Sequence, residues 1–255
     1  DPSVVVKWKP LGKLPTSVQD ILLDEVTDRL YVVVDGHGVF TAKPPVISDD
    51  FRILNAADLT RRETAPGGLL TVFGKTPERV TINGSVAPLL FSDGMETQIQ
   101  VPYNVQGKTI SLMLSTKPES REIIYPLTET SPAIFVDRGS PLVLDAVTSR
   151  SIEARHPAVA GSRILVLTTG LGAVKPAWPT GVPGPANASP VVVKPVKAYL
   201  GDILLDVKSA VLASGYIGMY VVELEIPLLV KTGVMELSLE ISGVRSNRVR
   251  IPIRR

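Results

Sequence analysis

The sequence predicts an all-β protein in which two immunoglobulin-like β-sandwiches follow one another. Short runs in which apolar and polar residues alternate recur at roughly ten-residue spacing, as in the strands of a sandwich. The chain of 255 residues also contains 22 Pro and 20 Gly, a content typical of many short strands joined by tight turns. Finally, one pattern of strands occurs twice, so most of the chain is one module in two copies.

The repeat is clearest at two strand endings that a proline closes. Residues 98–102 read Gln-Ile-Gln-Val-Pro, and residues 223–227 read Glu-Leu-Glu-Ile-Pro. Three further stretches match in the same order: 107–114 with 233–239, 120–127 with 246–253 and, more loosely, 82–84 with 199–201. In each strand one face is apolar and the other polar, which indicates one buried and one solvated side.

Residues 1–50 precede the repeat and contain four short runs. An isolated β-branched run between Pro2 and Pro10 predicts a lone strand; its members are Val4, Val5, Val6 and Trp8. Residues 20–24, 29–34 and 39–42, with a Gly-rich turn at 35–38, predict a small antiparallel meander. The meander resembles one blade of a β-propeller, and one blade cannot close a ring. Two interpretations stay open: a propeller remnant, or strands that pair elsewhere.

The repeat sets the expected domains. Residues 51–136 form the first sandwich and residues 137–255 the second. Within the second, residues 173–195 carry six prolines, at positions 176, 179, 183, 185, 190 and 195. Proline cannot donate to a strand ladder, so this stretch predicts an extended, polyproline-like excursion. No segment longer than about ten residues has helical periodicity.

From about residue 53 onward, motifs in both halves resemble one family, the uncharacterised C-terminal domain of secreted acidobacterial proteins ("Solibacter uncharacterised C-terminal domain"). In the first half these lie at 55–57, 65–67, 73–74, 80–84, 98–103 and 133–135; in the second, at 169–172, 179–183, 215–220 and 246–247. The resemblance implies export, halves similar to IPT/TIG modules, and a place behind a propeller. It implies no catalytic residues. The chain departs from the family at 75–79, which is shorter, and at His156, where the family has Asn.

Composition excludes several classes of function. Lys and Arg number 27 against 25 Asp and Glu, so no strong field attracts nucleic acid. The chain has no Cys, which excludes disulfides and thiolate chemistry. No apolar run approaches the ~18 residues of a membrane span. A chain that begins Asp1-Pro2-Ser3 predicts either a processed mature protein or a trimmed piece of a longer chain.

The chain contains few side chains of the types that enzymes use for catalysis. The chain has two histidines, His37 and His156, and both lie in turn-like contexts without a Gly-x-Ser-x-Gly elbow. Carboxylates gather at residues 20–28 and at Asp49-Asp50, but no Asp-x-Asp-x-Asp-Gly calcium loop accompanies them. We therefore expect no cofactor, no metal and no enzymatic activity, and hydrolase is the third and weakest class.

Two features are candidates for partner contacts. The run Val4, Val5, Val6 and Trp8 must pair with a sheet edge to satisfy its backbone. It does so within its own chain or, by β-augmentation, on a neighbouring subunit. Trp178, within the Pro-rich excursion, either belongs to a partner-binding loop or pins that loop to the sandwich.

Two hypotheses of function follow. The first is an exported structural or adhesive protein of the cell exterior, whose subunits join through the N-terminal strand into a filament or surface array. The alternative is an accessory module at the C-terminus of a secreted propeller protein, which recognises polysaccharide or another surface protein. The expected partner is thus another copy of this chain, or a cell-surface protein or polysaccharide, and no nucleic acid is expected.

Overall fold

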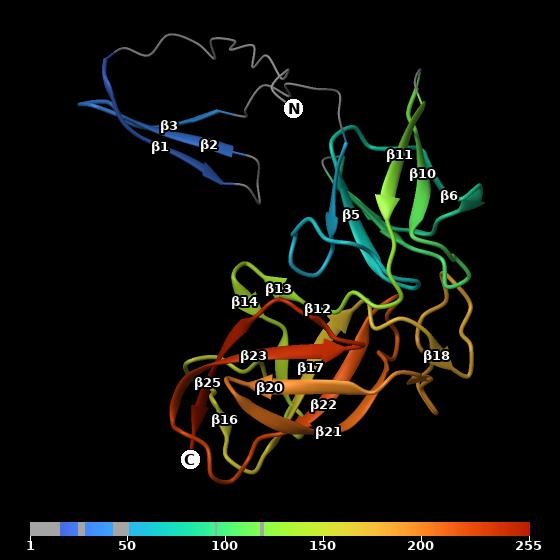
Figure 1. Cartoon of the computed structure of the whole chain (residues 1–255). Helices are drawn as coiled ribbons and strands as arrows, with labels where there is room; N and C mark the ends of the chain where they lie inside the picture. Colours follow the sequence, from blue (N-terminus) through green and yellow to red (C-terminus); the bar gives the residue numbers. More distant parts are fainter. Residues whose placement is uncertain (1–15, 25–28, 43–50, 95, 118–119) are drawn as a thin grey trace. The chain divides into compact units, whose positions relative to one another are not determined.

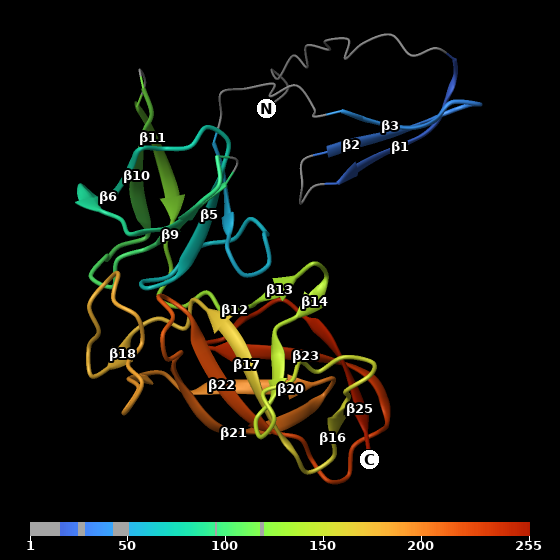
Figure 2. The ribbon, with the colours of Figure 1, turned by 180° about the vertical axis from the view of Figure 1, so that it is seen from behind.

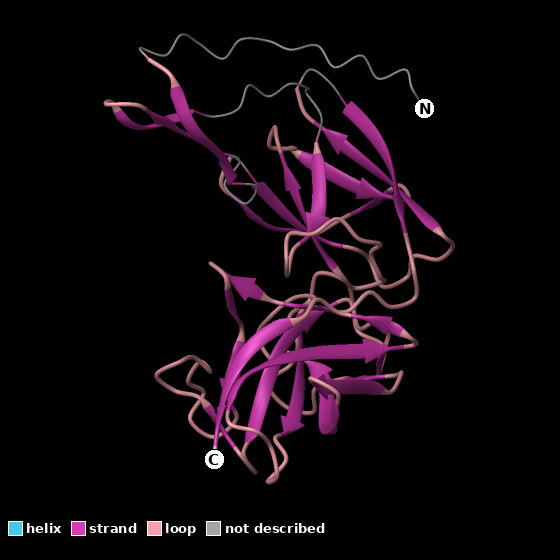
Figure 3. Cartoon of the chain, turned by 60° about the vertical axis from the view of Figure 1, so that its left-hand side comes forward, coloured by secondary structure: helices cyan, strands magenta, loops and turns pink. Residues whose placement is uncertain are grey.

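The structure, a computed structural model, describes residues 16–24, 29–42, 51–94, 96–117 and 120–255. Strands and turns make up these residues, and no helix occurs in them (Figure 3). None of the described residues therefore forms a helix that could cross a membrane. The all-β prediction is confirmed. The chain divides into Asp1–Asp50 and Phe51–Arg255, and each unit is described by itself.

The described part of Asp1–Asp50 is a three-stranded antiparallel meander. Its strands are β1 (Val18–Asp24), β2 (Arg29–Val34) and β3 (Gly38–Ala42), in the order β1-β2-β3. Gly36 and Gly38 have positive φ in the turn between β2 and β3, where His37 is exposed and its Nδ1 lies 2.9 Å from the Asp35 carbonyl oxygen. The predicted meander is confirmed. The predicted strand at Val4, Val5, Val6 and Trp8 lies outside the described residues.

The first sandwich packs two four-stranded sheets face to face (Figure 1). One sheet has the order β4-β5-β9-β8 and the other β11-β10-β6-β7. The bounds are β4 (Arg52–Asn55), β5 (Leu69–Phe73), β6 (Arg79–Ile82), β7 (Ser85–Val86), β8 (Leu89–Ser92), β9 (Glu96–Gln100), β10 (Thr109–Ser115) and β11 (Ser120–Pro126). Alternation explains the packing: Ile110, Leu112 and Leu114 of β10 are fully buried, whereas the residues between them face outward.

The second sandwich contains the remaining strands, which the view from behind shows as two layers (Figure 2). They are β12 (Ala133–Ile134), β13 (Val136–Asp137), β14 (Ser140–Pro141), β15 (Val143–Asp145), β16 (Ala158–Val159), β17 (Arg163–Thr169), β18 (Val174–Lys175), β19 (Val191–Val192), β20 (Val196–Leu200), β21 (Ile203–Leu212), β22 (Tyr220–Glu225), β23 (Gly233–Ile241), β24 (Val244–Arg245) and β25 (Val249–Arg254). The main path runs β12-β17-β22-β21-β20-β23-β25-β16. The long strand β21 belongs to both layers, since it pairs with β22 and with β20.

Each sandwich has its own apolar core. In the first, the buried side chains include Leu70, Ile82, Ile99 and Leu112; in the second they include Ile164, Leu200, Leu224 and Leu237. The strand pairing reproduces the sequence repeat, because β10 lies between β11 and β6 as β23 lies between β25 and β20. The tandem immunoglobulin-like fold predicted from the repeat is therefore present.

Candidate functional site

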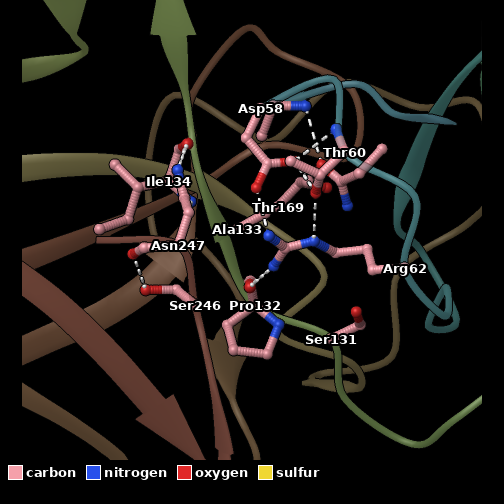
Figure 4. Close-up of polar contacts among 12 residues, drawn as sticks. Asp58, Thr60, Arg62, Ser131, Pro132, Ala133, Ile134, Thr169, Ser246 and Asn247 are labelled. Carbon is pink, nitrogen blue, oxygen red and sulfur yellow. Dashed lines mark hydrogen bonds and ion pairs between the residues drawn. The ribbon is translucent and has the colours of Figure 1, made fainter. Parts of the chain in front are cut away.

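The segment between the two sandwiches is held by a half-buried arginine, Arg62, that pairs with a buried carboxylate. Arg62 forms an ion pair with Asp58, and its Nη1 donates to the carbonyl oxygen of Pro132 at 2.9 Å (Figure 4). The Asp58 side chain is only 4% exposed, and it also accepts from the Thr60 hydroxyl at 2.8 Å. Breaking a buried pair leaves an uncompensated charge, at a cost of about 3–5 kcal/mol. The loop of the first sandwich thus fixes the path of the connecting chain.

From the other side, the second sandwich holds the same segment through one asparagine. Ile134 donates its backbone N–H to Asn247 Oδ1 at 2.7 Å, and Asn247 Nδ2 donates to the Ile134 carbonyl at 2.9 Å (Figure 4). These two hydrogen bonds take the place of a backbone pair between adjacent β-strands. The connecting chain is therefore bonded to both sandwiches within a few residues.

Direct contacts between the sandwiches complete this junction. The Leu69 N–H donates to Thr169 Oγ1 at 3.2 Å, and the same hydroxyl donates to the Gly218 carbonyl at 2.8 Å. A Cβ placed on Gly218 would lie 2.5 Å from Leu69 Cδ2, so only glycine allows this close approach. The two cores are separate, but the surfaces between them touch.

The Pro-rich excursion also contacts the first sandwich. The Gly181 N–H donates to the Gln100 side-chain oxygen at 2.7 Å, and the Tyr103 N–H donates to Thr180 Oγ1 at 3.1 Å. Gln100 is 1% exposed, so the first of these bonds is buried on the side of the first sandwich. The excursion is therefore hydrogen-bonded to the first sandwich through Thr180 and Gly181, and we call this contact the clasp.

Trp178 lies at the base of this excursion. Its indole N–H donates to the carbonyl oxygens of Val182 and Pro183 at 3.1 and 3.2 Å, and its ring packs partly against the second core. These contacts anchor the loop. The role predicted for Trp178 in partner binding stays a prediction.

Two tyrosines meet beneath the clasp. Tyr220 is fully buried, and its hydroxyl donates to the Gly172 carbonyl at 2.6 Å, with the Tyr103 hydroxyl 3.4 Å away. Burial, followed by the proximity of Tyr103, raises the pKa of Tyr220 well above its ordinary value. Burial likewise raises the pKa of Tyr103. Both hydroxyls are neutral at physiological pH, and they serve the junction as hydrogen-bonding groups.

A pocket opens at the other end of the second sandwich. Its volume is about 220 Å³, and its lining comprises Asp145, Thr148, Arg150, Ile152, Arg155, His156, Pro157, Val159 and Arg254. The strands place it there: β15, β22 and β25 run away from the junction, and Asp145 and Arg254 stand at their far ends. In Figure 1 the C-terminus and β16 mark this end.

Two short turns build the pocket's outer wall. Asp145 accepts from the backbone N–H groups of Thr148 and Val147 and from the Thr148 hydroxyl, at 2.7, 3.1 and 2.9 Å. Thr148, first through its backbone N–H, lowers the pKa of Asp145. Glu153 and His156 close the second turn, with Nδ1 of His156 3.3 Å from the Glu153 carboxylate. The inner wall is β16, which pairs in parallel with the end of β25.

The other residues singled out from sequence are described only in part, since residues 25–28 and Asp49-Asp50 lie outside the described ranges. His37 is an exposed turn residue, and of the carboxylates at residues 20–28 only Asp20 and Asp24 are described. Among the described residues, no group of three or more His, Cys, Asp or Glu side chains is placed to hold a metal ion. His156 is brought beside Arg155 and Arg254 in the pocket, an arrangement that the sequence analysis did not foresee. The sequence feature that could have indicated this pocket is the concentration of Arg residues at 150–155 and 245–255.

No model of a known protein family matches the chain, and no curated protein matches it either. Solved structures that are similar in fold include the following three. SGBP-B of Bacteroides ovatus, from a mixed-linkage glucan utilization locus and bound to a heptasaccharide, is 10% identical over 89% of this chain, with a TM-score of 0.36. Domains 5–6 of the S-layer protein SbsC are 12% identical over 80% of this chain and 98% of their own length, with a TM-score of 0.31.

The third, the titin immunoglobulin tandem A164–A165, is 11% identical over 80% of this chain and 95% of its own length, with a TM-score of 0.23. This chain spans about half of the SGBP-B structure, 52% of its length. At identities of 10–12% these similarities concern the fold alone.

Proposed function

We propose that this chain is a non-catalytic, exported component of a bacterial cell exterior, whose subunits join by strand addition into a filament or surface array. The resemblance to a family of secreted acidobacterial domains supports export, and we propose membership of that family with it. The first hypothesis from the sequence thus stands as the leading proposal, with the N-terminal strand as the donor.

One observation carries this proposal, the open edge at β11. In the second sandwich β16 pairs with Ile253 and Arg254 at the end of β25, and in the first an isolated parallel bridge joins Thr64 to Leu127, just after β11. In the first, β11 ends the sheet order, and no described strand pairs with its outer side over residues 120–125. Ile124 on this strand is 61% exposed. An uncovered strand of this length is a template for pairing with another chain.

Strand addition between a donor at one end and an acceptor elsewhere is a heterologous contact that need not close, so it produces fibres. Removal of residues 1–10 should then leave folded monomers, as judged by light scattering and electron microscopy. Ile124→Lys should do the same from the acceptor side. Val234→Lys is the matched control, because Val234 is 67% exposed on β23, away from the open edge, and this variant should assemble normally.

Assembly that persists after truncation would show that the donor strand is wrongly assigned. An intact chain that stays monomeric in every condition would refute self-association altogether. Both substitutions lie at exposed positions, where the free energy of unfolding changes by only about 0.5 kcal/mol, so neither outcome is confused with misfolding.

A second candidate function is an accessory module that binds polysaccharide, and the pocket bounded by Asp145, Arg150 and Arg254 favours it. Retention of the chain on immobilised polysaccharides tests this function. A chain that no glycan retains would count against it.

A further inference from the structure

The pocket at the far end of the second sandwich contains an excess of positive charge. Arg150, Arg155 and Arg254 line it, and all three side chains are exposed. None of them forms an ion pair with an acidic side chain among the described residues. Other arginines on this sandwich do have such partners: Arg163 bonds Glu223, and Arg248 bonds Glu236. The three pocket arginines therefore form a local group of cations without an ion-pair partner among the described residues.

The acidic residues near the pocket, Asp145 and Glu153, offset only part of the charge of the three arginines. Asp145 is the acidic side chain in the lining, and its carboxylate already accepts three hydrogen bonds from its own turn. Glu153 is engaged by His156 at 3.3 Å. Each of the three guanidinium groups, by contrast, presents several N–H donors in one plane, and this geometry matches that of carboxylate and sulfate groups.

We infer that this pocket binds the acidic group, carboxylate or sulfate, of an anionic polysaccharide. This inference rests on the second candidate function and names its ligand class. The volume of about 220 Å³ is below the roughly 300–1,000 Å³ of pockets that enclose a whole small molecule. The pocket volume fits one charged sugar residue, and the adjoining sugar residues of the polysaccharide would lie outside the pocket. Ile152, Pro157 and Val159 supply an aliphatic wall for the apolar face of the ring.

Nucleic acid fits this surface less well. Positive and negative side chains nearly balance over the chain, 27 against 25, so the field that draws in a polyphosphate is weak. The lining also contains no Phe, Tyr or Trp, the side chains on which unpaired bases stack. Binding of a sugar's acidic group by arginines does not require an aromatic stacking surface.

The test is retention of the full chain in affinity electrophoresis, at low and at physiological salt. The probes are polygalacturonate, which carries carboxylates, dextran sulfate, which carries sulfates, and neutral dextran. We expect retention by at least one acidic polymer and none by dextran. The variant Arg150→Gln/Arg155→Gln/Arg254→Gln should bind about tenfold more weakly or worse.

The matched control is Arg79→Gln/Lys108→Gln/Lys175→Gln. It removes the same three charges from exposed positions outside the pocket, and it should bind within about twofold of the parent, as expected for charges that act only at long range through screening salt. Circular dichroism confirms that both variants are folded. Titration with free sulfate separates the sources of the anion, since the polymer should bind more tightly than the ion.

Three results would overturn the inference. One is equal weakening by the pocket variant and the control. Another is equal retention by a DNA duplex or by phosphatidylglycerol vesicles, which would show a general preference for polyanions. The third is retention by neutral dextran that the pocket variant leaves unchanged; this would refute the pocket while the polysaccharide-binding function survived.

Discussion

The two sandwiches repeat one set of strands, and they differ where the second copy adds chain. Between β5 and β6 the first copy has only residues 74–78, whereas the equivalent connection from β17 to β20 spans residues 170–195 and contains the clasp. Between β15 and β17 the second copy has residues 146–162, which contain β16 and the pocket turns, where the first copy has the shorter connection 56–68 between β4 and β5. The clasp and the pocket turns thus both lie in connections that are longer in the second copy than in the first.

A single strand shows how small sequence changes produce this difference. In the second sandwich, β21 continues through an irregularity between Val207 and Ser209 and joins both sheets. In the first, Pro88 stands between β7 and β8, and the same path is split into two short strands. Proline cannot donate to a ladder, so it ends the pairing at this point. This strand is consequently continuous in the second sandwich and interrupted in the first.

The largest effect expected comes from equivalent core positions. Leu112 pairs with Ile82 as Leu237 pairs with Leu200, and both leucines are fully buried. Leu112→Ala and Leu237→Ala should each lower the free energy of unfolding by about 2–5 kcal/mol. Because the junction couples the sandwiches, calorimetry should show both variants shifting one shared transition.

Leu229→Ala is the control, since Leu229 is 91% exposed and its loss should leave that transition unchanged. Separate transitions, one moved by each core variant, would mean that the sandwiches unfold independently and that the junction contributes little.

A smaller effect should come from the glycine at the junction. The substitution Gly218→Ala would place a Cβ against Leu69, at a position where φ is +66°. We expect a loss of about 1–3 kcal/mol from overpacking and backbone strain, with the shared transition broadening or dividing. Gly215→Ala separates the two causes, because Gly215 has a φ of +78° and nothing within 4 Å of the added Cβ. Equal losses in both variants would show that the close approach is unimportant.

The smallest effect should come from Trp178. Trp178→Ala removes a half-buried ring and its indole donor from the clasp, for a loss of about 1–2 kcal/mol by thermal melting. Trp178→Phe keeps the ring packing and should lose less. Retention on acidic polysaccharide should be unchanged in both. A Trp178→Ala variant of normal stability that no longer binds glycan would make Trp178 a binding residue.

The sequence predicted the framework better than the site. Strand positions followed from alternation within each copy, as in Ile110, Leu112 and Leu114, because burial on one face leaves a period of two in the sequence. Arg254 lines the same pocket as Arg150, where β16 pairs with the end of β25. That parallel pairing depends on tertiary contacts that no local pattern encodes. The bond from Arg62 to Pro132 is equally long-range, so the junction was not foreseeable either.

The central claim is that ligand recognition lies in what the second copy adds. Hydrogen exchange of the full chain with and without an oligogalacturonate tests it most directly. Slower exchange should be confined to residues 145–159 and 250–255, with no change at the equivalent turns of the first sandwich at 56–68. Protection that appeared in the first sandwich, or at the Pro-rich excursion alone, would contradict the claim.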